Sequence, residues 1–209
     1  MPINYSINAD IVDIKNDSPK IEDKYIVDTN VWYWTAYTRA TLGKKPPAKS
    51  STLYYPSYIK KALQANSGLK CTSFSLAELA HLIECVEFEI NSAKLKLHNT
   101  QRKEFRHNFP TERSNVVSEI KAAWNQVSKI AQSLEIITND QTCKSMIQLL
   151  SSFPIDGYDS LIVEAMKLNN ITCIITHDGD FASIKGITIF TCNELLIKQA
   201  SSQNRLIIR

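Results

Sequence analysis

The chain has 209 residues, of which 44% are hydrophobic and 22% are charged, and its formal net charge is +3. This length and composition suit one elaborated globular domain with a sizeable core. The N-terminal segment lacks the basic-then-apolar pattern of a signal peptide, and no apolar run reaches about 18 residues, which argues against a transmembrane helix and favours a cytoplasmic protein. The five cysteines are widely spaced without a CxxC pair, so we expect reduced core residues and not disulfides or zinc ligands.

Taken in chain order, residues 1–23 are an N-terminal extension, which we interpret as an added strand, an arm that binds a partner or a disordered lead. Residues 24–28 form a short apolar run that ends in Asp28, and they predict a buried strand running into a turn or helix. The segment 42–51 predicts a loop. Pro56 is expected in the first turn of a helix that ends near Ala65.

The middle of the chain is mainly helical by its pattern. After a short predicted strand at 70–74, Ser75 is expected to be the N-cap of a helix over 76–90, with Glu78 three residues further on. Residues 98–111 are typical of a loop. Residues 114–134 have the apolar spacing of an amphipathic helix, and another helix is expected over 142–151.

The last part of the chain alternates between helix and strand. A helix is predicted over 155–170, followed by strands at 172–177 and 187–192. Strands that alternate with helices imply right-handed crossovers and a mainly parallel sheet, so the predicted fold class is α/β.

Two stretches of the chain are basic. Residues 29–77 contain no acid but seven bases, interleaved with tryptophan and tyrosine, and residues 94–109 form a second basic stretch. This mixture suits a phosphate backbone and unstacked bases, although a solvated face over core aromatics would have the same composition. The candidates for RNA binding are Lys44, Lys45, Lys49, Lys60, Lys61, Arg102, Lys103 and Arg106.

Four elements carry acids toward one edge of the predicted sheet. Sites in open parallel sheets gather at the carboxyl ends of strands. Asp28 follows one strand, and Asp178 and Asp180 follow another. Asp159 lies near the start of the helix that feeds the second of these strands, and Glu78 lies in the first turn of a helix. We therefore expect their carboxylates to converge.

Crowded carboxylates repel one another unless a cation neutralises them. Several oxygen ligands without histidine or cysteine at metal-ligand spacing favour Mg²⁺ or Mn²⁺ over zinc. Such a site activates water and stabilises the charge that develops on a phosphoryl group. The acids therefore predict metal-dependent phosphodiester chemistry, with the basic stretches holding the polyanion.

Four motifs in order resemble those of PIN domains, the fold of metal-dependent ribonucleases that include VapC-type toxins of toxin–antitoxin pairs. They are YIVDTNV, TSFSLAELAHL, DSLIVEAM and ITHDGDF, and together they span most of the chain. The resemblance implies a three-layer α/β/α sandwich with a mainly parallel central sheet and a Mg²⁺- or Mn²⁺-dependent endoribonuclease that leaves a 5′-phosphate and a 3′-hydroxyl. It also implies an RNA substrate, and it suggests an antitoxin partner and a homodimer.

Carried over onto this sequence, the resemblance makes an acidic quartet the catalytic and metal-binding set: Asp28, Glu78, Asp159 and Asp178. Asp180 matches a further acid, which would bind a second ion, hold a ligating water or brace the loop. Asn30 and Thr176 match polar residues that position the first and fourth acids, and Thr29 matches the small hydroxyl residue between Asp28 and Asn30. Residues 24–209 then form a single domain with insertions near 35–60 and 87–113, where both basic stretches lie.

Each acid also has a purely structural interpretation. Asp28 and Thr29 would each serve as caps of the following helix, and Glu78 would complete a capping box with Ser75. Asp156 rivals Asp159, three residues away, although its place in the turn IDGY favours a turn or capping role. The four histidines form no constellation, and His177 stands apart only because it adjoins the predicted site.

Three other functions compete with the nuclease interpretation. A calcium-binding EF-hand started at Asp178 would need glutamate where Ile189 stands. A phosphatase of the haloacid-dehalogenase type would need a second aspartate where Asn30 stands, because an amide cannot transfer the proton. The remaining alternative is a catalytically silent PIN-like module that binds RNA or protein, and such a module is expected to have lost some of the acids.

Overall fold

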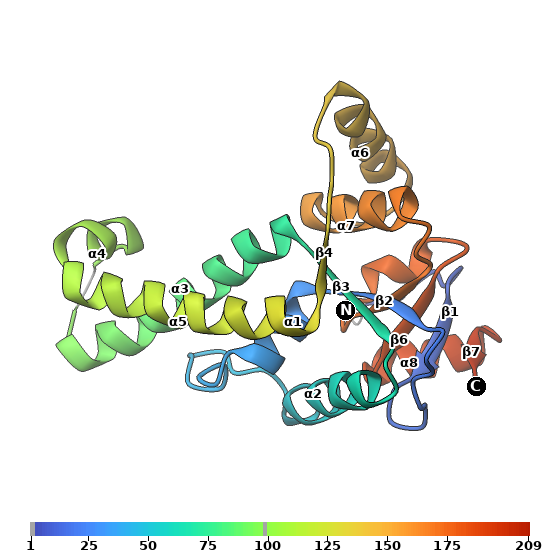
Figure 1. The fold of residues 1–209 in the computed structure, drawn as a ribbon, viewed down its shortest axis with the longest axis horizontal. Coiled ribbons are helices and arrows are strands. Elements are labelled where there is room, and N and C mark those ends of the chain that lie inside the picture. The colour runs from blue at the N-terminus through green and yellow to red at the C-terminus, as the bar shows by residue number, and fades with distance from the viewer. Residues whose placement is uncertain (1–2, 98–99) are drawn as a thin grey trace.

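A parallel sheet forms the centre of the computed structural model, which describes residues 3–97 and 100–209 (Figure 1). Its seven strands follow the order β4-β3-β2-β5-β6-β1-β7, and each neighbouring pair is parallel. The predicted α/β class is therefore confirmed. The strands are β1 (Asp10–Asp13), β2 (Lys24–Val27), β3 (Gly68–Thr72), β4 (Gln132–Leu134), β5 (Cys173–Ile175), β6 (Thr188–Thr191) and β7 (Leu206–Ile207).

Alternating side chains give the sheet two apolar faces. A row of isoleucines crosses four strands in register: Ile26 pairs with Ile174, Ile174 with Ile189, and Ile189 with Ile11. All four are buried on one face, whereas their chain neighbours point to the other. Each fully buried isoleucine contributes roughly 1.5–3 kcal/mol relative to an exposed one. This row fixes the register of the central strands, since a slip of one residue would turn it to the wrong face.

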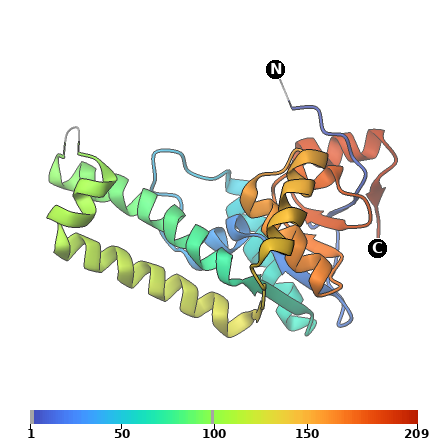
Figure 2. The ribbon, with the colours of Figure 1, turned by 90° about the horizontal axis from the view of Figure 1, so that it is seen from above.

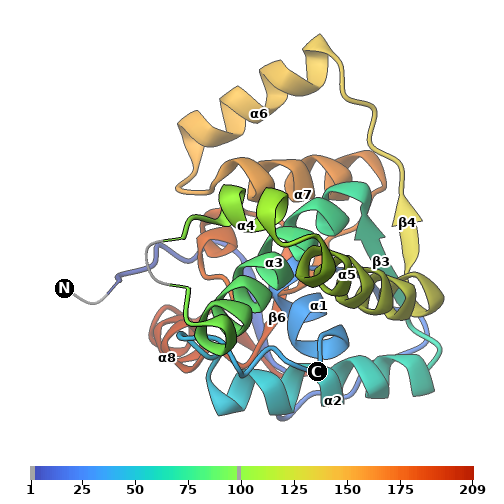
Figure 3. The ribbon, with the colours of Figure 1, turned by 90° about the vertical axis from the view of Figure 1, so that its left-hand side faces the viewer.

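Helices cover both faces, which makes a three-layer sandwich. On one side α1 (Thr29–Ala36) and α2 (Lys49–Gln64) bury aromatic side chains against the sheet. On the other side lie α7 (Gly157–Leu168), α8 (Glu194–Ser202) and the short helix η1 (Asp180–Ser183). Helix α6 (Asp140–Ser152) packs on α7, and Figure 3 shows this pair at the top and α2 at the bottom, on opposite sides of the molecule.

Three further helices build an arm that projects from the sandwich. Helix α3 (Ser73–Leu95) and helix α5 (Pro110–Ile130) lie side by side, and the short α4 (Arg102–Asn108) packs across their far ends (Figure 2). The near halves of α3 and α5 contribute Leu79, Ile83 and Val127 to the core. Helix α3 thus continues directly from the carboxyl end of β3, and α5 leads into the amino end of β4.

The N-terminal segment is bound to the surface of α8 by two glutamines. Gln199 accepts a hydrogen bond from the Tyr5 backbone N–H at 2.7 Å and donates to the carbonyl of Ile3 at 2.9 Å. Gln203 bonds to the backbone of Ile7 and Tyr5 in the same way. The chain then enters the sheet as β1, between β6 and β7.

The structure corrects three local predictions. Helix α2 begins at Lys49, so Pro56 lies inside it and not in its first turn. The helix tolerates the lost backbone hydrogen bond because Tyr55, Tyr58 and Ile59 on the same stretch are buried. Residues 102–108 form α4 where a loop was predicted, and α5 ends at Ile130, so residues 132–134 form β4. The predicted loop also included residues 98 and 99, which lie outside the described residues.

Candidate active site

Asp28 joins the end of β2 to the start of α1 and is 3% exposed. It occupies the N-cap position, yet its side chain makes no capping hydrogen bond. Its Oδ2 instead accepts a hydrogen bond of 2.7 Å from the Thr176 hydroxyl, which lies at the end of the neighbouring strand β5. The interpretation of this carboxylate as a mere helix cap is therefore wrong.

Thr176 also fixes the turn that carries the next two acids. Its hydroxyl accepts the backbone N–H of Asp178 at 2.9 Å, and Asp178 Oδ1 accepts the N–H of Asp180 at 2.9 Å. One hydroxyl thus donates to one acid and orients the backbone of another. This arrangement follows from the polar residues that come directly after a largely buried strand.

Asp159 enters from α7, in the first turn of that helix. It forms a reciprocal capping box with Asp156: the N–H of Asp159 bonds to Asp156 Oδ1 at 2.9 Å, and Asp159 Oδ2 accepts the N–H of Asp156 at 3.1 Å. Asp156 is therefore the N-cap, as predicted. One oxygen from each of Asp159, Asp178 and Asp180 lies within 4.8 Å of the others, close enough for a single cation.

Glu78 lies on α3, half-buried beside this group. The expected capping box with Ser75 is wrong, because the helix begins three residues earlier. Thr72 is the N-cap, its hydroxyl accepts the N–H of Ser75, and Ser75 returns the bond to the N–H of Thr72. Ser75 is thus the reciprocal partner in this cap, and the carboxylate of Glu78 has no part in starting the helix.

The charges of neighbouring acids add to the effect of burial on the pKa values of Asp28, Glu78, Asp159 and Asp180. Burial raises the pKa of Asp28 to about 7. The charges of Glu78 and Asp178 add to this rise, whereas the hydrogen bond from Thr176 acts to lower the pKa. Burial likewise raises the pKa of Asp159 to about 8, with smaller contributions from the charges of Asp156, Asp178 and Asp28. The pKa values of Glu78 and Asp180 are raised by burial and then by neighbouring acids, which include Asp178 in both cases. Carboxylates in this state favour a cation that neutralises them.

The donor set also fits a hard divalent cation. It consists of carboxylate oxygens with a hydroxyl beside them, the ligand type that Mg²⁺ and Mn²⁺ prefer. The Thr29 hydroxyl oxygen is buried and makes no full hydrogen bond to any described residue. It lies near enough to Glu78 to act against the rise in the pKa of that carboxyl. An unpaired hydroxyl beside the acids suits a ligand or the water shell of a cation.

His177 turns away from the acids, into an aromatic cluster. Its Nδ1 lies 3.0 Å from the Tyr55 hydroxyl, and its ring packs edge-on against Trp34 with centroids 5.5 Å apart. Burial lowers the pKa of His177, which favours the neutral ring. These contacts support the structural interpretation of this histidine.

Tyr5 forms a wall of the site that nothing in the sequence pattern indicated. Its ring lies so close to Gly179 that a Cβ at that position would be 2.2 Å from the Tyr5 Cζ. Burial raises the pKa of Tyr5, with the charges of Asp178 and Asp180 adding to the effect. Only glycine leaves room for this contact, so the N-terminal segment and the acidic turn fit together.

The basic candidates do not lie together. Lys44 and Lys45 line a cavity that begins at Asn30, next to Asp28, and Lys49 opens α2. Lys60 and Lys61 lie at the other end of α2, which leads into the amino end of β3 and therefore faces away from the acids. Arg102, Lys103 and Arg106 are on α4 at the tip of the arm, where Arg106 pairs with Glu84 at 3.0 Å.

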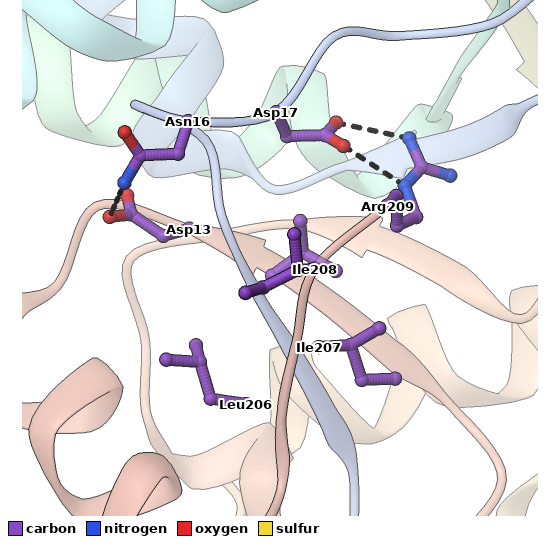
Figure 4. A pocket seen from close by; sticks show the side chains of 8 residues that line it. Asp13, Asn16, Asp17, Leu206, Ile207, Ile208 and Arg209 are labelled. Carbon is purple, nitrogen blue, oxygen red and sulfur yellow. Dashed lines mark hydrogen bonds and ion pairs between the residues drawn. The ribbon is translucent and has the colours of Figure 1, made fainter.

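A separate cavity of about 210 Å³ lies beside β1 and β7 at the sheet edge (Figure 4). Arg209 pairs there with Asp17 at 3.0 Å and with Asp23 at 2.8 Å. Burial acts to raise the pKa of Asp23, but the hydrogen bonds from Arg209 and Tyr25 overcome it and lower the pKa to about 2. Because these charges satisfy one another and the acidic cluster follows β2 and β5, we assign this cavity a structural role.

No protein-family model matches the chain, and no curated protein matches it. Within residues 3–97 and 100–209, every helix is too short or too polar to cross a membrane.

Proposed function

We propose that the protein is a Mg²⁺- or Mn²⁺-dependent endoribonuclease of the PIN type, which hydrolyses phosphodiester bonds of RNA. The observation that carries this proposal is the convergence of acids from separate elements: Asp159 from α7 meets Asp178 and Asp180 after β5, with Asp28 and Glu78 beside them. Acids gathered from distant parts of the chain at a cost in repulsion indicate a site for a cation and not a general surface feature.

A divalent ion bound there would supply Lewis-acid chemistry, lowering the pKa of a bound water and neutralising charge on the phosphoryl group. We assign Asp28, Glu78, Asp159 and Asp178 to holding this ion. An oxygen of Asp180 lies within 4.8 Å of oxygens of Asp159 and Asp178, so Asp180 offers a further carboxylate to the same ion.

The remaining polar residues keep the acids in place. Thr176 holds Asp28 at 2.7 Å and the backbone of Asp178 at 2.9 Å, so it sets the relation between two acids from different strands. The free hydroxyl of Thr29 would complete the hydrogen bonds of bound water. In this reaction water attacks phosphorus, and no side chain forms a covalent bond to the substrate.

The biological setting that we propose follows from the resemblance of the four sequence motifs to those of PIN domains. A toxin of a toxin–antitoxin pair would act on RNA in the cytoplasm, and the five free thiols suit a reducing compartment. The projecting arm of α3, α4 and α5 offers an extended surface for an antitoxin or a second copy of the chain.

Cleavage of a mixed-sequence RNA by the purified protein tests the proposal. The reaction is run with Mg²⁺, with Mn²⁺ and with EDTA, and with the Asp28→Asn and Asp159→Asn variants. Glu22→Gln is the matched control, because Glu22 is exposed and precedes the amino end of β2, on the far side of the sheet from the acids.

Cutting that needs the metal, Asp28 and Asp159 but not Glu22 would support the nuclease. Activity that persists in both aspartate variants would overturn it. Salt-sensitive RNA binding without cutting of any RNA supplied would favour the silent RNA-binding module instead.

A further inference from the structure

A cavity of about 400 Å³ opens beside the acidic cluster, between α1, α3 and the loop before α2. Its lining includes Asn30, Trp34, Lys44, Lys45, Leu82 and Glu89. The volume lies in the range of sites that bind small organic groups. Its aromatic, apolar and cationic side chains together suit a nucleotide.

Two helices that carry acids of the site also carry residues that line the cavity. On α1, Asp28 is at the N-cap position, Asn30 lies in the first turn, and Trp34 lies one turn further, about 6 Å along the axis. On α3, Glu78 is followed by Leu82 on the same face and then by Glu89. Both helices therefore carry an acid at one end and the cavity lining beyond it. A chain whose phosphate lies at the acids would reach the cavity with an adjacent nucleotide.

Trp34 forms a rigid wall of this cavity. It packs at 5.3 Å between centroids against Tyr55 and edge-on against His177. Tyr55 is itself fixed, since its hydroxyl lies 2.9 Å from the Thr191 hydroxyl and 3.0 Å from the Thr176 carbonyl. An aromatic ring that is braced from behind and partly exposed in front is a platform on which a base can stack with little loss of side-chain entropy.

Backbone contacts with α3 hold the segment of Lys44 and Lys45 at the rim of the cavity. The N–H of Lys44 donates to Glu89 Oε2 at 2.7 Å, and Gly43 lies close to Val86 and Glu89 of α3. The side chains of Lys44 and Lys45 are exposed, and no described carboxylate lies within ion-pair distance of either ammonium group. Glu89 adds negative charge to the cavity itself, so a phosphate belongs at the lysines and an uncharged base belongs inside.

We propose that this cavity binds one unstacked base of single-stranded RNA, that Trp34 stacks on it, and that Lys44 and Lys45 hold its flanking phosphate. The site would then select which bond meets the acidic cluster. This inference rests on the proposed nuclease function. It excludes duplex RNA as a ligand of the cavity, because a paired base cannot leave its stack without an added cost in free energy.

Binding of a short labelled single-stranded RNA to the full chain tests the inference, in the Asp28→Asn background so that the RNA stays intact. Trp34→Ala should weaken binding by about 5- to 100-fold, and Trp34→Phe should restore most of it. Lys44→Gln with Lys45→Gln should weaken binding and reduce the slope of log affinity against log salt by about 1.4. The control is Lys20→Gln with Lys185→Gln, two exposed lysines before the amino ends of β2 and β6.

A second measurement protects the test against misfolding of the Trp34→Ala variant. Photo-crosslinking of RNA that carries 5-iodouridine to the Asp28→Asn protein should mark Trp34, and unlabelled single-stranded RNA should compete at least ten-fold better than duplex. Crosslinks confined to other residues, equal competition by duplex, or effects no larger than those of the control pair would overturn the inference, as would absence of RNA binding.

The two proposals fail separately. If the protein cuts RNA with metal but its affinity for RNA does not depend on Trp34, Lys44 and Lys45, the base site is overturned and the nuclease proposal stands. If the protein never cuts RNA but binds it through these three residues, the nuclease proposal is overturned and the base site stands.

Discussion

Thr176 donates its hydroxyl proton to Asp28 across the ends of two adjacent parallel strands, at 2.7 Å, while the same oxygen accepts the N–H of Asp178. The two acids are far apart in the chain, and this single side chain sets their relative position. Asp28 is buried, so a hydrogen bond to its charged form matters more there than it would in water.

Replacing Thr176 by valine keeps the shape and removes both hydrogen bonds. The free energy of unfolding should fall by about 1–3 kcal/mol, because a buried carboxylate oxygen and a backbone N–H lose their partner. Under the proposed function, the affinity for Mn²⁺ should fall by about 10- to 100-fold. Urea denaturation and calorimetric titration with Mn²⁺ measure the two effects. Thr176→Ser keeps the hydroxyl and should retain most of both, so equal losses in the serine and valine variants would contradict the role of the hydroxyl.

Substitutions of Ser75 and Glu78 should have different effects, the first on stability and the second on metal binding and cleavage. Ser75→Ala removes the capping box with Thr72 and should lower the free energy of unfolding by about 1 kcal/mol. Glu78→Gln leaves that cap intact, so it should not destabilise the metal-free protein, and it should weaken Mn²⁺ binding and RNA cleavage. Denaturation in EDTA, together with the Mn²⁺ titration, distinguishes the two. A destabilised Glu78→Gln protein with normal Mn²⁺ affinity would return this residue to a structural role.

Stability of the metal-free protein should fall as the pH rises. The pKa of Asp28 is about 7 and that of Asp159 about 8 in the folded chain, against about 4 when unfolded. The folded state then binds more protons than the unfolded state between about pH 4 and pH 8. The stabilisation is therefore fully present below pH 4 and is lost as the pH rises through these values. Each group contributes a slope of up to roughly 1.4 kcal/mol per pH unit within this window.

A divalent cation should reverse this loss. Mg²⁺ or Mn²⁺ binds the deprotonated carboxylates, so it should stabilise the protein strongly at pH 8 and little at pH 5. Urea denaturation at both pH values, with EDTA and with Mn²⁺, gives the four free energies needed. Asp28→Asn should show a shallower fall with pH in EDTA and a smaller gain from Mn²⁺. Equal stabilisation by Mn²⁺ at pH 5 and pH 8 would show that the ion binds elsewhere.

Local sequence predicted the four strands β2, β3, β5 and β6, and it predicted that Asp159, Asp178 and Asp180 lie close together, because both depend on short patterns. The apolar runs before Asp28 and Asp178 are buried strands, and the isoleucine row follows from their alternation. The pairs Thr72–Ser75 and Ser75–Glu78 both fit the spacing of a capping box. The correct choice depends on where β3 ends, and β3 ends opposite Leu134 of β4, more than sixty residues away. Sequence spacing alone could not decide between them.

Long-range contacts also explain the other misses. Helix α2 includes Pro56 because Tyr55 reaches Thr176 and Thr191 on two strands that come much later in the chain. The cavity beside Trp34 exists only because α1 and α3 pack together, and the sequence showed no more than aromatic and basic residues in one stretch. No sequence pattern indicated the contact of Tyr5 with the acidic turn, because its partner Gly179 looks like an ordinary turn glycine.

The contact between Tyr5 and Gly179 predicts that substitutions at these two positions are energetically coupled. Gly179→Ala places a Cβ 2.2 Å from the Tyr5 Cζ, so the ring must leave the acidic turn. The far end of a tyrosine moves easily, and the loss should be about the burial free energy of part of one ring, roughly 1 kcal/mol. In a Tyr5→Ala background the same substitution should be nearly neutral, because the backbone of Gly179 has φ −84°, which alanine adopts without strain. Denaturation of the wild type, both single variants and the double variant gives the coupling energy. A coupling near zero would mean that Tyr5 does not rest on the acidic turn in solution.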